Sequence, residues 1–336
     1  MSESKLNIAV FVGGTSPERE VSKSSGKAIY QAINSLGYKC VLIDPAYGTF
    51  QPDEEEKYFT IKDFSEIKNE NLIKTINSDL LNNIDLVFLA LHGKWGEDGI
   101  IQTLLELRGI NYTGSGVLSS AISMDKAVSK TIFQKNNVNT AAWFTDTKRY
   151  KINDVIKTIN KGFGYPCVIK PNDQGSTVGM TIAKKDDEVK NAIELALGFS
   201  DLALIEEYIP GREMTVAILN DNPLPVLEII PKDGFYNYES KYTDGMSEYI
   251  VPAEIPDDVF KNVQEQAVKA FHSLRCKIYG RVDFRLNEDN IPYCLEVNTL
   301  PGMTSTSLVP KMAKVIGISF EELIDKIIRN SVDGKK

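Results

Sequence analysis

Residues 6–12 (LNIAVFV) form a nearly continuous apolar segment that ends at Gly13-Gly14. An apolar run without alternation is typical of a strand buried on both faces of a parallel sheet, and paired glycines allow a tight turn at its end. The pattern then predicts a helix over residues 17–36 and a second strand over residues 39–44. Strand, helix and strand form a βαβ unit, so we expect a parallel α/β domain in the N-terminal part.

A third apolar strand, over residues 85–91, runs directly into a glycine-rich loop over residues 92–99. Strand, glycine-rich loop and helix is the arrangement of a ligand site at the carboxyl end of a sheet. Residues 51–83 are predicted to form a polar crossover. The other elements expected here are a helix, a short strand and one long helix, over residues 100–108, 110–113 and 119–136.

After Tyr165 the pattern changes to short strands separated by turns, which is typical of antiparallel sheets joined by hairpins or a helix. A chain of 336 residues is long enough for two or three domains, which we place at residues 1–118, 119–208 and 209–336. The predicted strands of this part span residues 166–170, 180–183, 204–208, 214–219, 224–229, 279–286 and 292–298, and the predicted helix spans residues 258–274.

The chain is acidic, with 38 basic and 46 acidic side chains and a formal net charge of −8. It therefore has no general attraction to nucleic acid or to a membrane surface. Met1–Lys5 is too polar for a signal peptide, and no apolar run reaches the about 18 residues of a membrane span. We expect a cytoplasmic protein with buried free thiols, because the four cysteines form no CxxC pair: Cys40, Cys167, Cys276 and Cys294.

Charged and apolar residues alternate along residues 279–286. Successive side chains of a strand point to opposite faces, so Arg281, Asp283 and Arg285 are expected on one face. The apolar residues between them are expected to enter a core. Three charged side chains on one strand face favour either a binding site or a solvated sheet surface.

The neighbouring predicted strand carries Glu296 and Asn298 two residues apart, which leaves Leu295 and Val297 for the opposite face. Together with Asp283, these residues supply two carboxylates and an amide oxygen. Mg²⁺ takes such hard oxygen ligands when it also binds substrate phosphates. The alternative interpretation is a solvated face with ordinary cross-strand ion pairs.

Lys170 ends an apolar strand and precedes a loop with Gly175 and Gly179 and with hydroxyl side chains between them. The backbone N–H groups of such a loop can close over phosphate oxygens. The chain contains no GxxxxGK[ST] motif, so this is not a Walker loop. An ordinary hairpin turn is the alternative.

Glu18 lies in the first turn of the first predicted helix, with Thr15 or Ser16 as the cap. The helix dipole stabilises a carboxylate there, so a structural role at the helix cap explains the presence of Glu18 fully. The functional alternative is that Glu18 binds a substrate ammonium. His92, at the tip of the third strand, is equally open to a structural or a functional role. The polar and aromatic segment 234–248 is either a binding loop or plain surface.

Eight sequence blocks follow one another along the chain: GGTSPEREVS, LHGKWGEDG, YTGSG, SMDK, VIKPNDQGSTVGM, YESKY, GRVDF and LEVNTLPGMTSTSLVP. In this order they resemble the D-alanine:D-alanine ligase family of ATP-grasp enzymes, over about residues 6 to 325. The resemblance implies an α/β and α+β chain: an ATP-grasp fold, which holds ATP between two antiparallel sheets, preceded by an N-terminal parallel α/β domain.

The reaction that the resemblance implies joins two D-alanines at the expense of ATP. The carboxylate of the first attacks the γ-phosphate, and the amine of the second attacks the resulting acyl phosphate. The product, D-alanyl-D-alanine, would serve the synthesis of peptidoglycan precursors. A cytoplasmic homodimer is expected on the same grounds.

The resemblance also assigns residues to ATP and metal. Lys126 and Lys170 would bind phosphates. Glu206 would lie on the strand that contacts the adenine, and Glu213 would contact the ribose. Glu207 stands where some members carry lysine. The full implied ATP set is Lys126, Lys170, Ser176, Glu206, Glu207, Ile209, Glu213, Tyr236 and Lys241. The implied Mg²⁺ ligands are Asp283, Glu296 and Asn298, with Glu296 shared by two ions; Mn²⁺ and a monovalent cation are compatible with the family.

For the substrates, Glu18 with His92 nearby would bind the ammonium of the first D-alanine. Arg281 and the N–H of Gly302 would bind the developing oxyanion, and Ser307 and Lys241 the carboxylate of the second D-alanine. In the family, hydrogen bonds couple the residues at the positions of Glu18, Ser176 and Tyr242. A tyrosine at position 242 favours a second substrate that attacks with an amine over a hydroxy acid. The implied catalytic set is Glu18, Ser176, Tyr242, Arg281, Gly302 and Ser307.

Two other functions remain open. The nearer one is a ligase of the same fold that joins D-alanine to D-serine or D-lactate. The other is a nucleotide-binding protein without ligase activity, such as a dinucleotide-binding dehydrogenase. Residues 13–18 read GGTSPE and contain no GxGxxG, which argues against the dehydrogenase.

Overall fold

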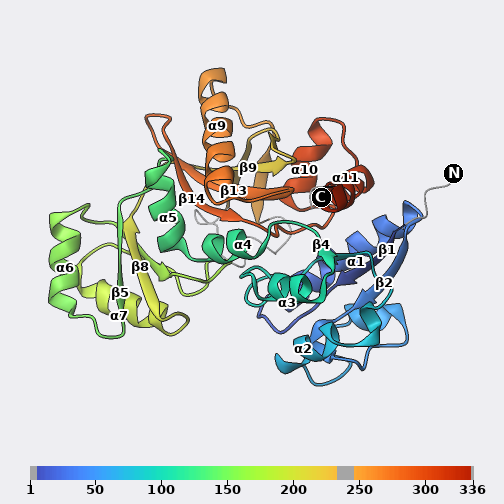
Figure 1. The fold of residues 1–336 in the computed structure, drawn as a ribbon. Helices are drawn as coiled ribbons and strands as arrows, with labels where there is room; N and C mark the ends of the chain where they lie inside the picture. The colour runs from blue at the N-terminus through green and yellow to red at the C-terminus, as the bar shows by residue number, and fades with distance from the viewer. Residues whose placement is uncertain (1–5, 233–245, 334–336) are drawn as a thin grey trace.

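The N-terminal part is a four-stranded parallel sheet with the strand order β2-β1-β3-β4 (Figure 1). The computed structural model of the protein describes residues 6–232 and 246–333. The strands span Asn7–Phe11 (β1), Lys39–Ile43 (β2), Leu86–Leu89 (β3) and Asn111–Tyr112 (β4), and helix α1 spans Arg19–Ser35. The predicted parallel α/β domain is confirmed, and β1 is buried along almost its whole length, as its unbroken apolar run requires.

The predicted polar crossover contains short helices that its weak periodicity did not reveal. They are η2 (Glu55–Phe59), α2 (Glu70–Ile76) and η3 (Asp79–Leu81), after η1 at Pro45–Tyr47. Helix α3 (Ile100–Arg108) follows the glycine-rich loop as predicted.

The prediction of one long helix over residues 119–136 is wrong. The segment forms α4 (Val117–Met124) and α5 (Lys126–Lys135), separated at Asp125, whose backbone is extended (φ −80°, ψ 100°). The Asp125 carboxylate accepts a 2.9 Å hydrogen bond from the backbone N–H of Val128 and so caps α5. Aspartate is a strong N-cap residue, and here it begins a second helix instead of continuing the first.

The central sheet is antiparallel, in the order β5-β8-β6-β7. Helices α6 (Ile152–Lys161) and α7 (Asp186–Leu197) pack against it around one apolar core. Its strands span Trp143–Thr147 (β5), Cys167–Pro171 (β6), Thr181–Ala183 (β7) and Leu202–Glu207 (β8). The sequence predicted the last three of these strands; β5 and α6 were missed.

The C-terminal sheet has the order β12-β11-β9-β13-β14, with β10 paired to β9, and helix α9 (Asp257–Ser273) packs on it. The predicted strand over residues 224–229 is shifted, because the chain turns after a two-residue strand and pairs again only from Leu227. The strands span Arg212–Leu219 (β9), Asn222–Pro223 (β10), Leu227–Pro231 (β11), Ser247–Ile250 (β12), Tyr279–Leu286 (β13) and Pro292–Asn298 (β14).

A β-bulge in β14 changes the predicted side-chain alternation. Asp283 pairs with Glu296 but Phe284 pairs with Cys294, so Leu295 is the extra residue. The core therefore takes Cys294 and Val297, and the prediction that Leu295 shares a face with Val297 is wrong. A bulge places two residues of one strand opposite one of its partner, which strict alternation cannot anticipate.

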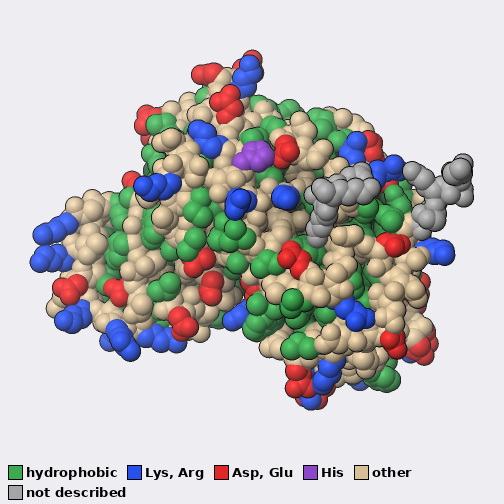
Figure 2. Space-filling model, viewed as in Figure 1, with side chains coloured by type: hydrophobic (Ala, Val, Ile, Leu, Met, Phe, Trp, Pro, Cys, Tyr) green, Lys and Arg blue, Asp and Glu red, His purple; other side chains and the backbone are tan. Residues whose placement is uncertain are grey.

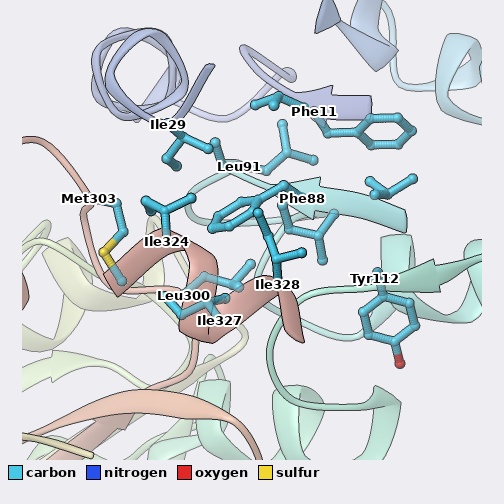
Figure 3. Close-up of a cluster of buried hydrophobic side chains, with 14 of the residues drawn as sticks. Phe11, Ile29, Phe88, Leu91, Tyr112, Leu300, Met303, Ile324, Ile327 and Ile328 are labelled. Atoms are coloured by element: carbon cyan, nitrogen blue, oxygen red, sulfur yellow. The ribbon is translucent and has the colours of Figure 1, made fainter. Parts of the chain in front are cut away.

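The last two helices, α10 (Leu308–Val315) and α11 (Phe320–Asp333), complete the core of the first sheet. Figure 3 shows Ile324, Ile327 and Ile328 of α11 facing Phe88 of β3, with Leu91 just beyond that strand. Leu300 and Met303, from the segment after β14, belong to the same buried cluster. The C-terminal end of the chain is thus part of the N-terminal core.

Acidic and basic side chains are interspersed over the face shown in Figure 2. Among residues 6–232 and 246–333, no helix is both long and apolar enough to cross a membrane. All four cysteines are free, as predicted; three are buried and Cys40 is half-buried.

Candidate active site

A cavity of about 500 Å³ lies where the three sheets meet. Residues far apart in the sequence line it, from the start of α1, the loop after β3, the start of α5, the Gly175–Gly179 loop, strands β13 and β14 and the segment before α10. Nine of the residues singled out from the sequence are in its wall: Glu18, His92, Lys126, Ser176, Arg281, Glu296, Asn298, Gly302 and Ser307.

The predicted metal ligands share one face of the C-terminal sheet. Asp283 lies directly opposite Glu296, and Arg281 lies opposite Asn298. Asp283 is not in the cavity wall: Arg281 binds both of its carboxylate oxygens, at 2.8 and 2.7 Å, and the hydroxyl of Thr215 donates to it at 2.6 Å.

The donor chemistry of this face suits Mg²⁺. Two carboxylates and one amide occupy neighbouring positions of two adjacent strands, and Mg²⁺ prefers oxygen ligands of this kind. No cluster of three His, Cys, Asp or Glu residues suited to a metal occurs in the part of the chain that the structure describes.

Lys126 is the first residue of α5, and its ammonium connects two walls of the cavity. Its Nζ lies 3.2 Å from Glu296 Oε2 and donates a 2.8 Å hydrogen bond to the carbonyl of Gln174. The helix break at Asp125 is what places this lysine at the cavity, because Lys126 begins the new helix there.

Lys170 does not line the cavity but forms a buried ion pair with Glu206. The Lys170 Nζ is 2.5 Å from one carboxylate oxygen of Glu206, and the Nζ of Lys130 is 2.9 Å from the other. The sequence interpretation missed Lys130, although it lies one helical turn after Lys126. Burial alone raises the pKa of Glu206, but the two ammonium groups outweigh it and lower the pKa to about 2.

This lowered pKa predicts an acid-sensitive contribution to stability. The Glu206 pKa falls from 4.5 to about 2 on folding, so its stabilising effect is complete above about pH 4.5 and is lost as the pH drops toward 2. Between pH 5 and pH 3, the free energy of unfolding should therefore fall more steeply for the unmodified protein than for Glu206→Gln. Urea denaturation at each pH measures this, with the adjacent Glu207→Gln as control; equal slopes for all three proteins would contradict it.

Glu18 occupies the N-cap position of α1, and the predicted cap at Thr15 or Ser16 is therefore wrong. Its side chain makes no capping hydrogen bond. The hydroxyl of Ser176 donates instead to the Glu18 carboxylate, which links α1 to the Gly175–Gly179 loop. Capping thus does not explain this carboxylate, which faces the cavity.

Ser176 sits on a strained stretch of backbone. It and Thr177 both have positive φ angles, 52° and 63°. Such conformations are uncommon outside glycine and concentrate at functional sites. The Ser176–Glu18 hydrogen bond is one contact that holds this part of the loop against the cavity.

His92 belongs to a buried chain of polar groups that the sequence did not reveal. Its Nδ1 lies 3.2 Å from Glu97 Oε1 and its Nε2 lies 3.2 Å from the hydroxyl of Ser25. That hydroxyl accepts a 3.3 Å hydrogen bond from the N–H of Met303, next to Gly302. Burial raises the pKa of Glu97. The chain fixes the Gly302 loop to the N-terminal part of the molecule.

Ser307 precedes α10, and its hydroxyl lies beside the same loop. It accepts a 3.0 Å hydrogen bond from the N–H of Thr304 and lies 2.8 Å from the Thr304 hydroxyl. Lys311 and Tyr249 also line the cavity, with the Lys311 ammonium 4.9 Å from the centre of the Tyr249 ring. The sequence interpretation missed both.

The other residues predicted to bind ATP lie away from the cavity wall or outside the described residues. Arg285 donates a 3.2 Å hydrogen bond to the carbonyl of Ile209 and lies 3.6 Å from the Glu213 carboxylate. Glu207 accepts a 3.5 Å hydrogen bond from the N–H of Ala142. The predictions for Tyr236, Lys241 and Tyr242 concern residues that lie outside the described residues.

Comparison with known proteins covers almost the whole chain. Residues 7–115 match the family model described as D-ala D-ala ligase N-terminus, and residues 132–329 match the one described as D-ala D-ala ligase C-terminus. A D-alanine–D-alanine ligase of Desulforamulus reducens is 42% identical over 336 residues, which cover 98% of this chain and 99% of that protein.

Solved structures agree with this match. The D-alanine–D-alanine ligase of Bacillus anthracis complexed with ATP is 32% identical with a TM-score of 0.78, and the alignment covers 98% of each chain. The VanG D-Ala:D-Ser ligase of Enterococcus faecalis is also 32% identical, with a TM-score of 0.81 over 98% of this chain and all of that one. The predicted ATP-grasp fold is confirmed, and the chain belongs to the D-alanine–D-alanine ligase family.

Proposed function

We propose that this protein joins two D-alanines into D-alanyl-D-alanine, with ATP as the energy source and Mg²⁺ as the metal. One observation carries the proposal: a single cavity of about 500 Å³ contains the Glu18–Ser176 pair, Lys126, Arg281 and the Glu296–Asn298 face. An anion receptor, an ammonium receptor and a metal-binding face are therefore adjacent, as the joining of an amino acid carboxylate to a phosphate requires.

In the first step the carboxylate of one D-alanine attacks the γ-phosphate of ATP, which gives an acyl phosphate and ADP. We assign Glu18 to the ammonium of this D-alanine, with His92 beside it, and Lys126 and Lys170 to the phosphates. Asp283, Glu296 and Asn298 would hold Mg²⁺, which supplies charge neutralisation to the phosphate oxygens when it is bound.

In the second step the amine of the second D-alanine attacks the acyl carbon, and phosphate leaves. Arg281 and the N–H of Gly302 would stabilise the oxyanion that forms at this carbon. Ser307, with Lys241, would hold the carboxylate of the second D-alanine. The coupling of Ser176 to Glu18 supports a role for the Gly175–Gly179 loop in excluding water from the acyl phosphate.

The nucleotide would lie between the central and C-terminal sheets, along the strand that ends at Glu206 and Glu207, with Ile209 and Glu213 on its path and Tyr236 nearby. As part of the same proposal, the enzyme is a cytoplasmic homodimer and its product enters peptidoglycan precursors. Mn²⁺ and a monovalent cation are compatible with the oxygen ligands.

Phosphate release with ATP, Mg²⁺ and D-alanine, compared with L-alanine, tests the function directly. Release with D-alanine and formation of the dipeptide are expected. Release with L-alanine only would overturn the proposal. Product analysis with D-serine and D-lactate as acceptors tests the related function that the VanG ligase represents; a mixed product formed in preference to D-alanyl-D-alanine would replace the proposal by that function.

Gly93 offers a test of the role of Glu18. A Cβ atom at this position would lie 2.6 Å from the Glu18 carboxylate, and the backbone there has a φ of +67°. Gly93→Ala should therefore displace Glu18 and raise the KM for D-alanine by about tenfold or more, equivalent to about 1.4 kcal/mol of binding energy. Steady-state kinetics at saturating ATP measure this.

The matched control is Gly109→Ala. Gly109 has nearly the same φ, +74°, but a Cβ atom there would meet nothing within 4 Å. Both substitutions strain the backbone, so they should lower the melting temperature similarly. Only Gly93→Ala should change the KM for D-alanine; an equal change in both variants would point to strain alone.

A further inference from the structure

Three charged side chains form a buried row between helix α5 and the central sheet. Lys130 of α5 and Lys170 of β6 each face one carboxylate oxygen of Glu206, the penultimate residue of β8. The Lys130 side chain is 0% exposed, that of Glu206 is 3% exposed and that of Lys170 is 12% exposed. Lys170 is thus the member of the row that lies nearest to solvent.

The row carries two positive charges and one negative charge, so one positive charge is left over. Burial of charged groups costs several kcal/mol each, and well-packed apolar side chains in their place are often at least as stable. Stability alone therefore gives little reason for a second buried lysine. Burial is also the main cause that lowers the pKa of Lys130, which its attraction to Glu206 opposes.

Lys130 also reaches the opposite sheet. Its ammonium donates a 2.6 Å hydrogen bond to the hydroxyl of Thr140, and that hydroxyl donates a 2.9 Å hydrogen bond to the carbonyl of Cys294. Cys294 begins the bulge that leads to Glu296. The ammonium of Lys130 is therefore held from both sides, by Glu206 and by Thr140. Lys170, the most exposed of the three side chains, pairs with the other carboxylate oxygen of Glu206.

We propose that Lys130 is a positioning residue that neutralises Glu206, so that Lys170 can turn from this carboxylate to a phosphate of the nucleotide. In this arrangement Lys130 stays on Glu206 throughout the reaction. Without Lys130, Glu206 would have Lys170 as its remaining counter-ion, and Lys170 would be withdrawn from the phosphate. The inference rests on the proposed function, because it takes ATP as the ligand of Lys170.

The test compares Lys130→Met with the double variant Lys130→Met/Glu206→Gln. The single variant leaves the row without net charge and should raise the KM for ATP by about tenfold or more, with the KM for D-alanine changed by less than about twofold. The double variant restores one net positive charge, on Lys170. Its KM for ATP should lie within about threefold of that of Glu206→Gln alone, which is the reference for any direct contact of Glu206 with the nucleotide. Lys135→Met is the matched control, because Lys135 is an exposed lysine of the same helix.

The possible outcomes separate the inference from the proposed function. If the unmodified enzyme releases no phosphate with D-alanine, the proposed function fails. If it is active and Lys130→Met leaves the KM for ATP unchanged, or the double variant has a KM for ATP well above that of Glu206→Gln, the positioning role is wrong. If Lys130→Met does not fold, the comparison of the double variant with Glu206→Gln decides: similar KM values for ATP support the inference, and a large increase in the double variant overturns it.

Discussion

Asp283→Asn and Glu296→Gln should each lower kcat by at least about 100-fold, which corresponds to about 2.7 kcal/mol of transition-state stabilisation. The two carboxylates lie opposite each other on paired strands and provide the negative charge of the proposed Mg²⁺ site. An amide retains the shape and one oxygen of each side chain but removes that charge. Phosphate release at increasing Mg²⁺ concentrations measures the effect.

The control for both variants is Glu288→Gln, in the turn that joins the same two strands. Glu288 is exposed and outside the cavity wall, so its substitution should leave kcat within about twofold, as is usual for surface changes. Near-normal turnover of both site variants at saturating Mg²⁺ would show that the metal ligands lie elsewhere.

Arg281→Met should lower kcat by about 100-fold to 1000-fold, the range seen when one donor to an oxyanion is removed. Arg281 lines the cavity and holds both oxygens of Asp283, so the substitution removes the proposed oxyanion partner and also releases a proposed metal ligand. The KM for ATP should change much less, because Arg281 is assigned to the reacting carbon. Measurements of kcat and both KM values separate these effects.

Arg281→Lys distinguishes charge from geometry. Lysine keeps the positive charge but cannot bind a carboxylate with two parallel hydrogen bonds. We expect its kcat to lie between those of the unmodified enzyme and Arg281→Met. If Arg281→Met retained normal kcat and lost only affinity for ATP, Arg281 would belong to the nucleotide site instead.

Local periodicity predicted much of this fold. The unbroken apolar run of β1 and the alternation in β13 each depend on one strand and its burial, and both are visible in the sequence. The bulge at Leu295 was not, because it depends on how β14 pairs with β13. The break at Asp125 carried a recognisable N-cap residue, but the apolar periodicity on both sides of it favoured a continuous helix.

The sequence predicted residues of the candidate site where a family resemblance named them. It did not predict residues whose roles depend on contacts between distant segments. Glu97, Ser25 and Lys130 act through side chains that the fold brings together from different elements. Each is an ordinary polar residue in its local sequence. Their burial, which makes them informative, follows only from the packing of the sheets.

Helix α11 covers apolar surface of a sheet that is synthesised long before it. The first sheet is completed early in translation, yet part of its apolar surface packs against Ile324, Ile327 and Ile328, which come far later in the sequence. Phe88 and Leu91 therefore remain without this native cover until residues 324–328 have left the ribosome, long after the first sheet has been made. Such exposed apolar surface promotes aggregation of incomplete chains, so the nascent N-terminal part needs protection until α11 has been made.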